Sequence, residues 1–219
     1  MEPEAIPSGA RSAESKDPVR SQPETSRPDG RTGSFDSAPS GRSAQDDSSL
    51  AFDPTFLRIG QGYDVHAFAE GRKLILGGVD IPHTRGLLGH SDADVLAHAV
   101  ADALLGGIRG GDIGKLFPDT DPAYLNADSL KLLAAVADKV RAEGYVILDV
   151  DSVIAAQAPK LSPYREAMRE NLAAAMGIAV ENVGVKATTT EHLGFEGREE
   201  GISATAVCLL CRRPDEQRD

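Results

Sequence analysis

Residues 145–187 read YVILDVDSVIAAQAPKLSPYREAMRENLAAAMGIAVENVGVKA, and this stretch decides the fold. Its opening part, 145–157, is rich in Val, Ile and other apolar residues, and it predicts a long strand. Ser162 and Pro163 then supply an N-cap and a first-turn proline, so they predict a helix that ends at Gly177. A further strand is predicted at 183–187. The order of strand, helix and strand indicates an α/β domain.

The same alternation continues outward on both sides of this stretch. The other predicted elements are a strand at 57–62 that leads into 63–66, a hairpin of 73–76 and 79–81, helices at 92–105 and 129–142, and a strand at 202–211. Ser91 is the expected N-cap of the helix at 92–105. Together these elements predict a two-layer α/β (α+β) domain, in which a mixed sheet carries helices packed on one face.

The ends of the chain have a different composition. The first 53 residues or so are rich in Ser, Pro, Gly, Asp and Arg without a hydrophobic period, which predicts a disordered N-terminal extension over 1–55. The folded domain is expected at 56–212, followed by a disordered tail at 213–219. The extension carries Arg and Ser, as plastid transit peptides do, but also ten Asp and Glu, which such peptides avoid. A bacterial cytoplasmic location is therefore favoured over a plastid.

Charge and hydropathy exclude several partners. The formal net charge of the 219 residues is −11, which disfavours nucleic acids and anionic membrane surfaces as partners. No apolar run has the length of a membrane span, and no secretory signal is present. Cys208 and Cys211 lie in a strand-like run without a second cysteine pair, so we expect buried, inert thiols in a reducing compartment. An anionic substrate would need metal ions or placed donors to overcome the acidic field.

Asp64 and His66 are the first candidate metal ligands. Residues two apart on a strand project to the same side, so these two side chains can converge. His98, on the helix at 92–105, is the natural third ligand, and two histidines with one carboxylate leave a zinc position open for catalysis. Asp94 and Asp102 lie four residues either side of His98, so one of them is expected to hold its free ring nitrogen. On spacing alone, ordinary partly buried histidines are the simpler interpretation.

Two further segments could contact phosphate. The stretch 111–121 is rich in glycine and proline, and could form a semi-rigid lid around Phe117, although a plain surface loop has the same composition. The stretch 186–191 places three threonine hydroxyls before Glu191, at the end of a strand. Hydroxyls can donate to phosphate and a carboxylate can hold a hard cation, but a threonine run is also ordinary in a β-rich region.

Five segments together carry a family resemblance. They are Gly62–His66, Leu88–Asp92, Gly111–Thr120, Ala156–Lys160 and Val185–Phe195. They resemble the successive signatures of the 2-C-methyl-D-erythritol 2,4-cyclodiphosphate synthase family, in that family's order, between about Arg58 and Leu210. Each segment alone is a weak signal, whereas five in order are highly specific.

The resemblance implies two metal ions and one reaction. Zinc would be bound by Asp64, His66 and His98, and a second divalent ion, magnesium or manganese, by Glu191. The 2-phosphate of 4-diphosphocytidyl-2-C-methyl-D-erythritol 2-phosphate would attack the β-phosphorus, CMP would leave, and a cyclic diphosphate would form in non-mevalonate isoprenoid biosynthesis. Cations suit this chemistry, because two anionic phosphates must be brought together.

The resemblance also assigns roles to residues that bind substrate. His90 and Thr189 match the transition-state stabilisers. The residues expected to contact substrate are Asp64, Val65, His66, His90, Ser91, Asp112, Ile113, Gly114, Phe117, Pro118, Asp119, Thr120, Asp121, Ala156, Gln157, Ala158, Pro159, Lys160, Leu161, Ser162, Thr188, Thr189, Thr190, Glu191, Phe195 and Arg198. Among them, 112–114 would position the methylerythritol unit, 117–121 would close over it, and 156–162 would form the cytosine pocket.

The family's assembly is implied as well. Its members are homotrimers with active sites between subunits, and some hold an isoprenoid diphosphate in a central cavity near an Arg and a Glu. Arg198 matches the Arg, whereas Thr205 stands where we expect the Glu. His192 replaces a more usual Lys, and we expect it to be exposed and neutral to catalysis.

Two alternative functions fit parts of the sequence. A zinc-dependent phosphohydrolase is suggested by the His90–Asp92 segment and the two-histidine set, and it would release phosphate rather than CMP. A non-catalytic trimeric scaffold would use the N-terminal extension to recruit a partner. The open zinc position argues against the scaffold, which has no need of one.

Overall fold

The computed structural model describes residues 54–213, so the predicted disordered segments 1–55 and 213–219 lie almost wholly outside the described residues. The described chain begins with a single 3-10 turn, η1 (Pro54–Phe56), which leads directly into the first strand. None of the helices in this range has the length and apolar character that crossing a membrane requires.

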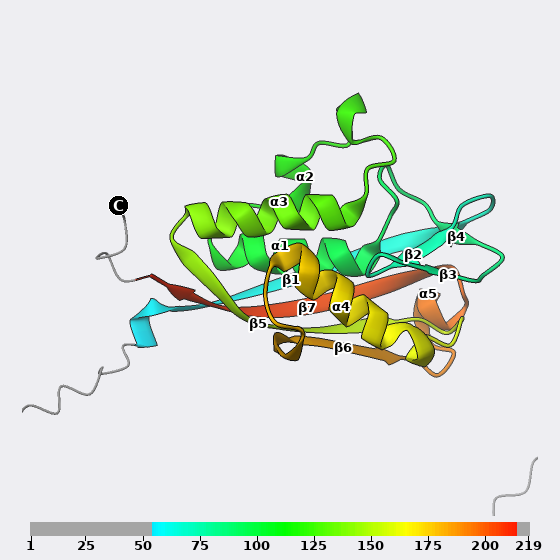
Figure 1. Ribbon diagram of the computed structural model, residues 1–219. Coiled ribbons are helices and arrows are strands. Elements are labelled where there is room, and N and C mark those ends of the chain that lie inside the picture. Colours follow the sequence, from blue (N-terminus) through cyan, green and yellow to red (C-terminus); the bar gives the residue numbers. More distant parts are fainter. Residues whose placement is uncertain (1–53, 214–219) are drawn as a thin grey trace, which may run out of the picture. The chain divides into compact units, whose positions relative to one another are not determined.

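A five-stranded mixed sheet, with strand order β4-β1-β7-β5-β6, forms the base of the fold (Figure 1). Its strands are β1 (Leu57–Ala69), β4 (Gly86–Leu87), β5 (Tyr145–Ala155), β6 (Val183–Thr188) and β7 (Gly201–Arg212). Only β5 and β6 are parallel, and the other neighbouring pairs are antiparallel. A parallel pair needs a crossover connection, and helix α4 (Arg165–Met176) lies within it. The predicted strand–helix–strand unit and the mixed sheet are confirmed.

Helices α1 (Val95–Gly107), α3 (Ser129–Ala142) and α4 lie on one side of this sheet, as Figure 1 shows. The predicted hairpin is present as β2 (Leu74–Leu76) and β3 (Val79–Ile81). The short elements that sequence patterns did not indicate are β4, α2 (Ile113–Leu116), α5 (Gly194–Gly197), and the 3-10 turns η2 (Pro122–Tyr124) and η4 (Val180–Asn182). All of them are too short to show a period.

The core lies between the helices and alternate residues of the sheet. On β7 the buried set is Ile202, Ala204, Ala206, Cys208 and Leu210. Cys208 is buried as predicted, its thiol donates to the carbonyl oxygen of Ala103 on α1, and burial raises the pKa of this thiol to about 11, which disfavours the thiolate. The expectation that Cys211 is also buried is wrong, because this residue is half-buried on the other side of β7.

The opposite face of the sheet exposes apolar side chains. Ile59 is 69% exposed, Tyr63 54%, Val65 43% and Val207 41%. They lie on the central strands β1 and β7, whose registered partners alternate between the two faces. Exposed apolar side chains gathered on one face of a sheet are typical of an interaction surface.

Helix α1 begins later than the sequence indicated. Its N-cap is Asp94, not Ser91, and the Asp94 carboxylate accepts hydrogen bonds from the backbone N–H groups of Leu96 and Ala97. The same fully buried carboxylate also accepts from the N–H groups of Gly77 and Gly78, in the turn between β2 and β3. This second role is tertiary, so cap preferences alone could not choose Asp94.

The start of α4 also differs from the prediction. Residues Ser162–Tyr164 form a 3-10 turn, η3, and α4 begins at Arg165 without a side-chain cap. Ser162 is therefore not the helix N-cap. The end is as predicted, since Gly177 adopts the left-handed conformation with φ of 63° that closes the helix. Helix α3 matches its predicted bounds, with Asp128 as its N-cap.

Two glycines let β1 and α1 approach closely. A Cβ atom on Gly62 would lie 2.0 Å from the carbonyl oxygen of Ala99, and one on Gly60 would lie 1.8 Å from that of Ala103. These obstacles are backbone atoms of α1, so a side chain at either position would force the helix away from the strand. The contact sets the distance between β1, which carries Asp64, and α1, which carries His98.

We expect Gly62→Ala to separate these two elements. Overpacking of this kind costs about 1–3 kcal/mol of unfolding free energy, and the shift of α1 would weaken the predicted metal binding at His98, next to Ala99. Chemical denaturation and zinc titration would measure the two effects. Gly106→Ala is the control within α1, since its Cβ would meet nothing closer than 3.4 Å. Native-like zinc affinity in Gly62→Ala would contradict the expectation.

Candidate metal-binding active site

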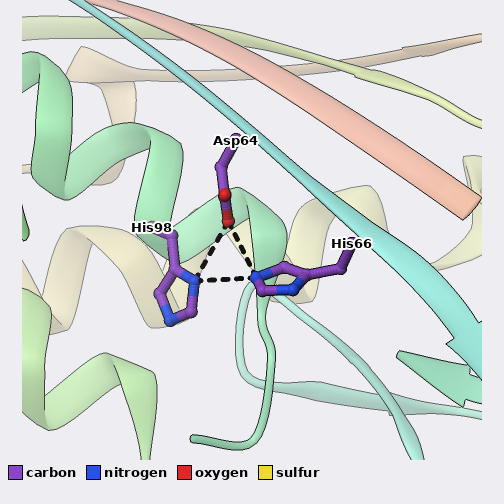
Figure 2. Close-up of side chains that lie close together, drawn as sticks. All are labelled: Asp64, His66 and His98. Carbon is purple, nitrogen blue, oxygen red and sulfur yellow. Dashed lines mark hydrogen bonds and ion pairs between the residues drawn. The ribbon is translucent and has the colours of Figure 1, made fainter. Parts of the chain in front are cut away.

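Three donor side chains converge between β1 and α1. The Asp64 Oδ2 atom lies 3.0 Å from His66 Nε2 and 3.0 Å from His98 Nδ1. The two ring nitrogens are 3.2 Å apart. Figure 2 shows the three side chains pointing toward one another, with Asp64 and His66 coming from the strand and His98 from the helix. This is the one group in the range 54–213 whose donor atoms could together hold a metal ion.

In each histidine, the ring nitrogen that faces away from the cluster makes a hydrogen bond, and this bond determines which nitrogen faces the other donors. His66 Nδ1 lies 2.7 Å from the carbonyl oxygen of Leu88, which can only accept, so this nitrogen carries the proton. His98 Nε2 lies 2.9 Å from Ser129 Oγ and 3.2 Å from Ser91 Oγ. The prediction that Asp94 or Asp102 holds His98 is wrong. Asp94 caps α1, and Asp102 accepts a hydrogen bond from the N–H of Ile113 at 2.7 Å.

The electrostatics of the cluster favour a cation at its centre. Burial raises the pKa of the Asp64 carboxyl, but hydrogen bonds from His66 and His98 outweigh it and hold that pKa well below its usual range. Burial lowers the pKa of His66, but its hydrogen bond and attraction to Asp64 raise the net pKa above the ordinary value. The carboxylate is thus ionised, and it stabilises positive charge between the three donors.

A pocket of about 540 Å³ opens beside the cluster. Its lining residues are Asp64, His66, Gly89, His90, Ser91, His98, Ile113, Gly114, Phe117, Pro118, Asp119, Tyr124 and Leu132. Most of the predicted phosphate and methylerythritol residues are therefore gathered in one place. Gly89, Tyr124 and Leu132 were not predicted as site residues, and the edge-to-face contact of Tyr124 with Phe117, at 5.2 Å between ring centroids, braces the loop.

Some predicted residues of this region do not line that pocket. The Val65 side chain belongs to the exposed apolar face, because it alternates with Asp64 and His66 along β1. Asp112 caps α2 by accepting from the N–H of Lys115, and the Asp121 carboxylate caps η2. The carbonyl oxygen of Asp121 accepts from His90 Nε2 at 3.2 Å, which joins the loop to the predicted transition-state residue.

A second pocket, of about 370 Å³, contains the whole predicted cytosine segment. Its lining residues are Ala156, Gln157, Ala158, Pro159, Lys160, Leu161, Ser162, Arg165, Ala187, Thr188 and Thr189. Arg165 was missed, because nothing in the sequence distinguishes it from other charged residues at a helix start. The two pockets share no lining residue.

The threonine segment forms a turn between β6 and α5. Thr189 Oγ1 donates to Glu191 Oε1 at 3.0 Å, and Thr190 Oγ1 donates to the carbonyl oxygen of Leu193. Glu191 and His192 both have positive φ angles, of 53° and 61°. His192 is exposed as expected, and its N–H donates to Gln157 Oε1, in the second pocket. Within the described residues, Glu191 does not join a group of metal-binding side chains.

Neither Arg198 nor Phe195 is among the residues that line these two pockets. Phe195, in α5, is half-buried. Arg198 pairs with Glu200, with 2.8 Å between Arg198 Nε and Glu200 Oε1. Thr205 lies on β7 opposite Tyr63, and the carboxylate that pairs with Arg198 belongs to Glu200.

Comparison with known proteins identifies the family. Residues 57–211, which are most of the chain, match the YgbB family. The chain belongs to the YgbB family. The family relationship predicted from the five segments is confirmed, because curated relatives at about 60% identity are named 2-C-methyl-D-erythritol 2,4-cyclodiphosphate synthase.

Three relatives of the YgbB chain illustrate the similarity. The 2-C-methyl-D-erythritol 2,4-cyclodiphosphate synthase of Trichlorobacter lovleyi is 62% identical over 154 residues, which cover 70% of this chain and 98% of that protein. The bifunctional IspDF from Campylobacter jejuni matches with a TM-score of 0.69 and 46% identity, over 71% of this chain and 42% of that one. The CDP complex of IspF from Plasmodium falciparum matches with a TM-score of 0.63 and 34% identity, over 72% and 97% of the two chains.

Proposed function

We propose that this YgbB-family chain is a 2-C-methyl-D-erythritol 2,4-cyclodiphosphate synthase of non-mevalonate isoprenoid biosynthesis. It converts 4-diphosphocytidyl-2-C-methyl-D-erythritol 2-phosphate to the cyclic diphosphate and CMP. The observation that carries the proposal is the convergence of Asp64, His66 and His98 at the mouth of a pocket, in a chain whose relatives bear that name.

The donor set fits zinc. Two imidazole nitrogens and one carboxylate oxygen are a usual catalytic zinc set, and the open side of the group faces the pocket. When bound, zinc supplies positive charge that lowers the cost of bringing two phosphates together. The protein orients both histidines before a metal ion binds, because in each ring the nitrogen that faces away from the cluster makes a hydrogen bond.

The reacting phosphates lie between His90 and Thr189 in this proposal. An oxygen of the 2-phosphate forms a bond to the β-phosphorus, and the bond from that phosphorus to the CMP oxygen breaks, with its electron pair leaving on CMP. His90 and Ser91, on the pocket wall, donate to phosphate oxygens, and Thr189 stabilises the charge that develops. We assign the second divalent ion, magnesium or manganese, to Glu191, which Thr189 contacts.

The two ends of the substrate occupy the two pockets. Small residues at 156–162 let backbone groups reach the cytosine, and Lys160 meets negative charge. The loop at 112–121 holds the methylerythritol unit and keeps water from the diphosphate. Because one substrate must reach both pockets, and one chain keeps them separate, we propose that each active site combines the pockets of two subunits.

A homotrimer provides such sites. The exposed apolar face of β1 and β7 supplies surface for the contact between subunits. The Arg198–Glu200 pair would lie near the mouth of the central cavity, where an isoprenoid diphosphate would bind. The enzyme is assigned to the bacterial cytoplasm, in keeping with bacterial relatives such as that of Trichlorobacter lovleyi.

Turnover of the diphosphocytidyl substrate tests the function. CMP and inorganic phosphate are followed together, in protein loaded with zinc and magnesium or manganese, and again after chelation. We expect one CMP for each cyclic product, no phosphate, and loss of turnover on chelation. Phosphate release would instead indicate the zinc phosphohydrolase. Absence of turnover in a zinc-loaded trimer would indicate the scaffold.

A further inference from the structure

Ser129 and Asp92 form a hydrogen-bonded chain behind His98. Ser129 Oγ lies 2.9 Å from His98 Nε2, on the side of the ring opposite to Asp64. The Ser129 hydroxyl also makes a short hydrogen bond to Asp92 Oδ1, and Asp92 Oδ2 accepts from the backbone N–H of Ser129 at 3.1 Å. Ser129 is 1% exposed, so water does not compete for its hydroxyl.

The direction of each hydrogen bond in this chain is determined. A carboxylate only accepts, so the single hydroxyl proton of Ser129 points to Asp92. The Ser129 oxygen is then an acceptor toward His98, so the hydrogen bond between them places the ring proton on Nε2, and Ser91 Oγ, 3.2 Å from the same nitrogen, can accept from it as well. In the neutral ring the lone pair is therefore on Nδ1, the nitrogen that faces Asp64 and His66, and this is the form of the ring that binds a metal ion.

Asp92 is itself held from several sides. Its Oδ1 accepts from the N–H of Asp94 at 3.2 Å, and its own N–H donates to the carbonyl oxygen of Ala127 at 3.0 Å. A second backbone bond, from Asn126 N–H to the His90 carbonyl oxygen at 2.8 Å, joins the same two segments. The start of α3 is thus fastened to the segment that leads into α1, and Ser129 has little freedom to move away from His98.

We infer that Ser129 and Asp92 are positioning residues that hold His98 in the orientation and protonation form required to bind zinc. The inference rests on the proposed zinc-dependent function, and it extends the site to α3, which supplies no metal ligand. It also explains why Ser129 is a buried polar residue at a helix start that already has Asp128 as its cap.

Zinc affinity of the variant chains tests the inference without substrate. Competition with a chromophoric chelator gives the zinc dissociation constant, and we expect Ser129→Ala to raise it by about 10- to 100-fold, as is usual for loss of a partner of a metal-bound histidine. Asp92→Asn should have a smaller effect in the same direction, because its amide keeps one acceptor oxygen. Nitrogen-15 NMR of zinc-free Ser129→Ala should show that His98 carries its proton on Nε2 in a smaller fraction of molecules than in the native protein.

Ser152→Ala is the matched control. Ser152 is also 1% exposed, and its hydroxyl donates to the carbonyl oxygen of Gly184, away from the metal ligands. Its loss should lower stability without changing zinc affinity. Native zinc affinity in Ser129→Ala, or an equal loss in Ser152→Ala, would overturn the inference.

The two proposals can fail separately. If the native chain binds zinc tightly, loses affinity in Ser129→Ala, and releases no CMP, the positioning role stands and the proposed reaction fails. If the native chain releases CMP and Ser129→Ala binds zinc as tightly as the native chain, the reaction stands and the positioning role fails.

Discussion

Replacing His98 by alanine is expected to abolish CMP release. His98 supplies one of three donors, and its Nδ1 atom is 3.0 Å from Asp64 Oδ2 and 3.2 Å from His66 Nε2. Two remaining donors hold zinc poorly, and a metal ion contributes several kcal/mol to stabilising the charge of a reacting phosphate. At about 1.4 kcal/mol for each factor of ten, turnover should fall by roughly a thousandfold or more.

The measurement is the rate of CMP formation at saturating substrate, together with bound zinc per chain. His83→Ala is the control, because the His83 ring lies outside the donor group, stacked 5.3 Å from Phe68 and bonded through Nδ1 to the carbonyl oxygen of Arg85. It should keep native zinc content and turnover. Turnover above a tenth of the native rate in folded His98→Ala would show that this ligand set does not carry the reaction.

The convergence of the three candidate ligands could be anticipated in part from local geometry, whereas their assignment to a metal came from the family resemblance, since spacing alone favoured ordinary histidines. Asp64 and His66 are two residues apart on a strand, so they necessarily share a face, and His98 lies on a helix with a clear apolar stripe. Gly60 and Gly62 alternate along β1 on the face toward α1, where they let the strand and the helix approach closely. The glycines read as strand residues, however, and only the packing shows that they set this distance.

The support behind His98 could not be predicted, because it is not local. Helical spacing places Asp94 and Asp102 on the same side as His98, and a search along the helix finds only these. The ring instead reaches Ser129, 31 residues away, at the start of α3. Sequence spacing does not show which other helix begins next to His98, so this contact appears only in the folded chain.

The prediction of Ser91 as the N-cap of α1 was wrong for a related reason. Ser91, Asp92 and Asp94 are all good N-cap residue types, and a local pattern cannot rank them. The tertiary fold decides, because Asp94 also meets the turn between β2 and β3, while Asp92 is engaged by Ser129. Ser91 contacts His98 Nε2 at 3.2 Å, so three polar residues within four positions have three different contacts that only the folded chain determines.

Removing the Asp94 carboxylate should be strongly destabilising. The group is fully buried and accepts four backbone hydrogen bonds, from Gly77 at 2.9 Å, Gly78 at 2.7 Å, Leu96 at 3.1 Å and Ala97 at 3.1 Å. Asp94→Ala leaves these N–H groups buried without an acceptor, and each such group costs about 1–3 kcal/mol. Allowing for relaxation, we expect a loss of roughly 4 kcal/mol in unfolding free energy.

Asp94→Asn should lose less, because the amide oxygen can still accept at the start of α1 while its NH₂ group faces the N–H of Gly78. Chemical denaturation of zinc-free protein, at one fixed concentration, would measure both variants, since subunit association adds to apparent stability. Asp138→Ala is the control, as this carboxylate is 80% exposed and pairs only with Arg141 at the surface. The expected unfolding free energy is lowest for Asp94→Ala, intermediate for Asp94→Asn and close to native for Asp138→Ala.

A loss of unfolding free energy under about 1 kcal/mol in Asp94→Ala, the range of one ordinary hydrogen bond, would mean that the hairpin and α1 are held together without the Asp94 carboxylate. Early exchange of the Gly77 and Gly78 amide protons in Asp94→Ala would locate the loss at this junction.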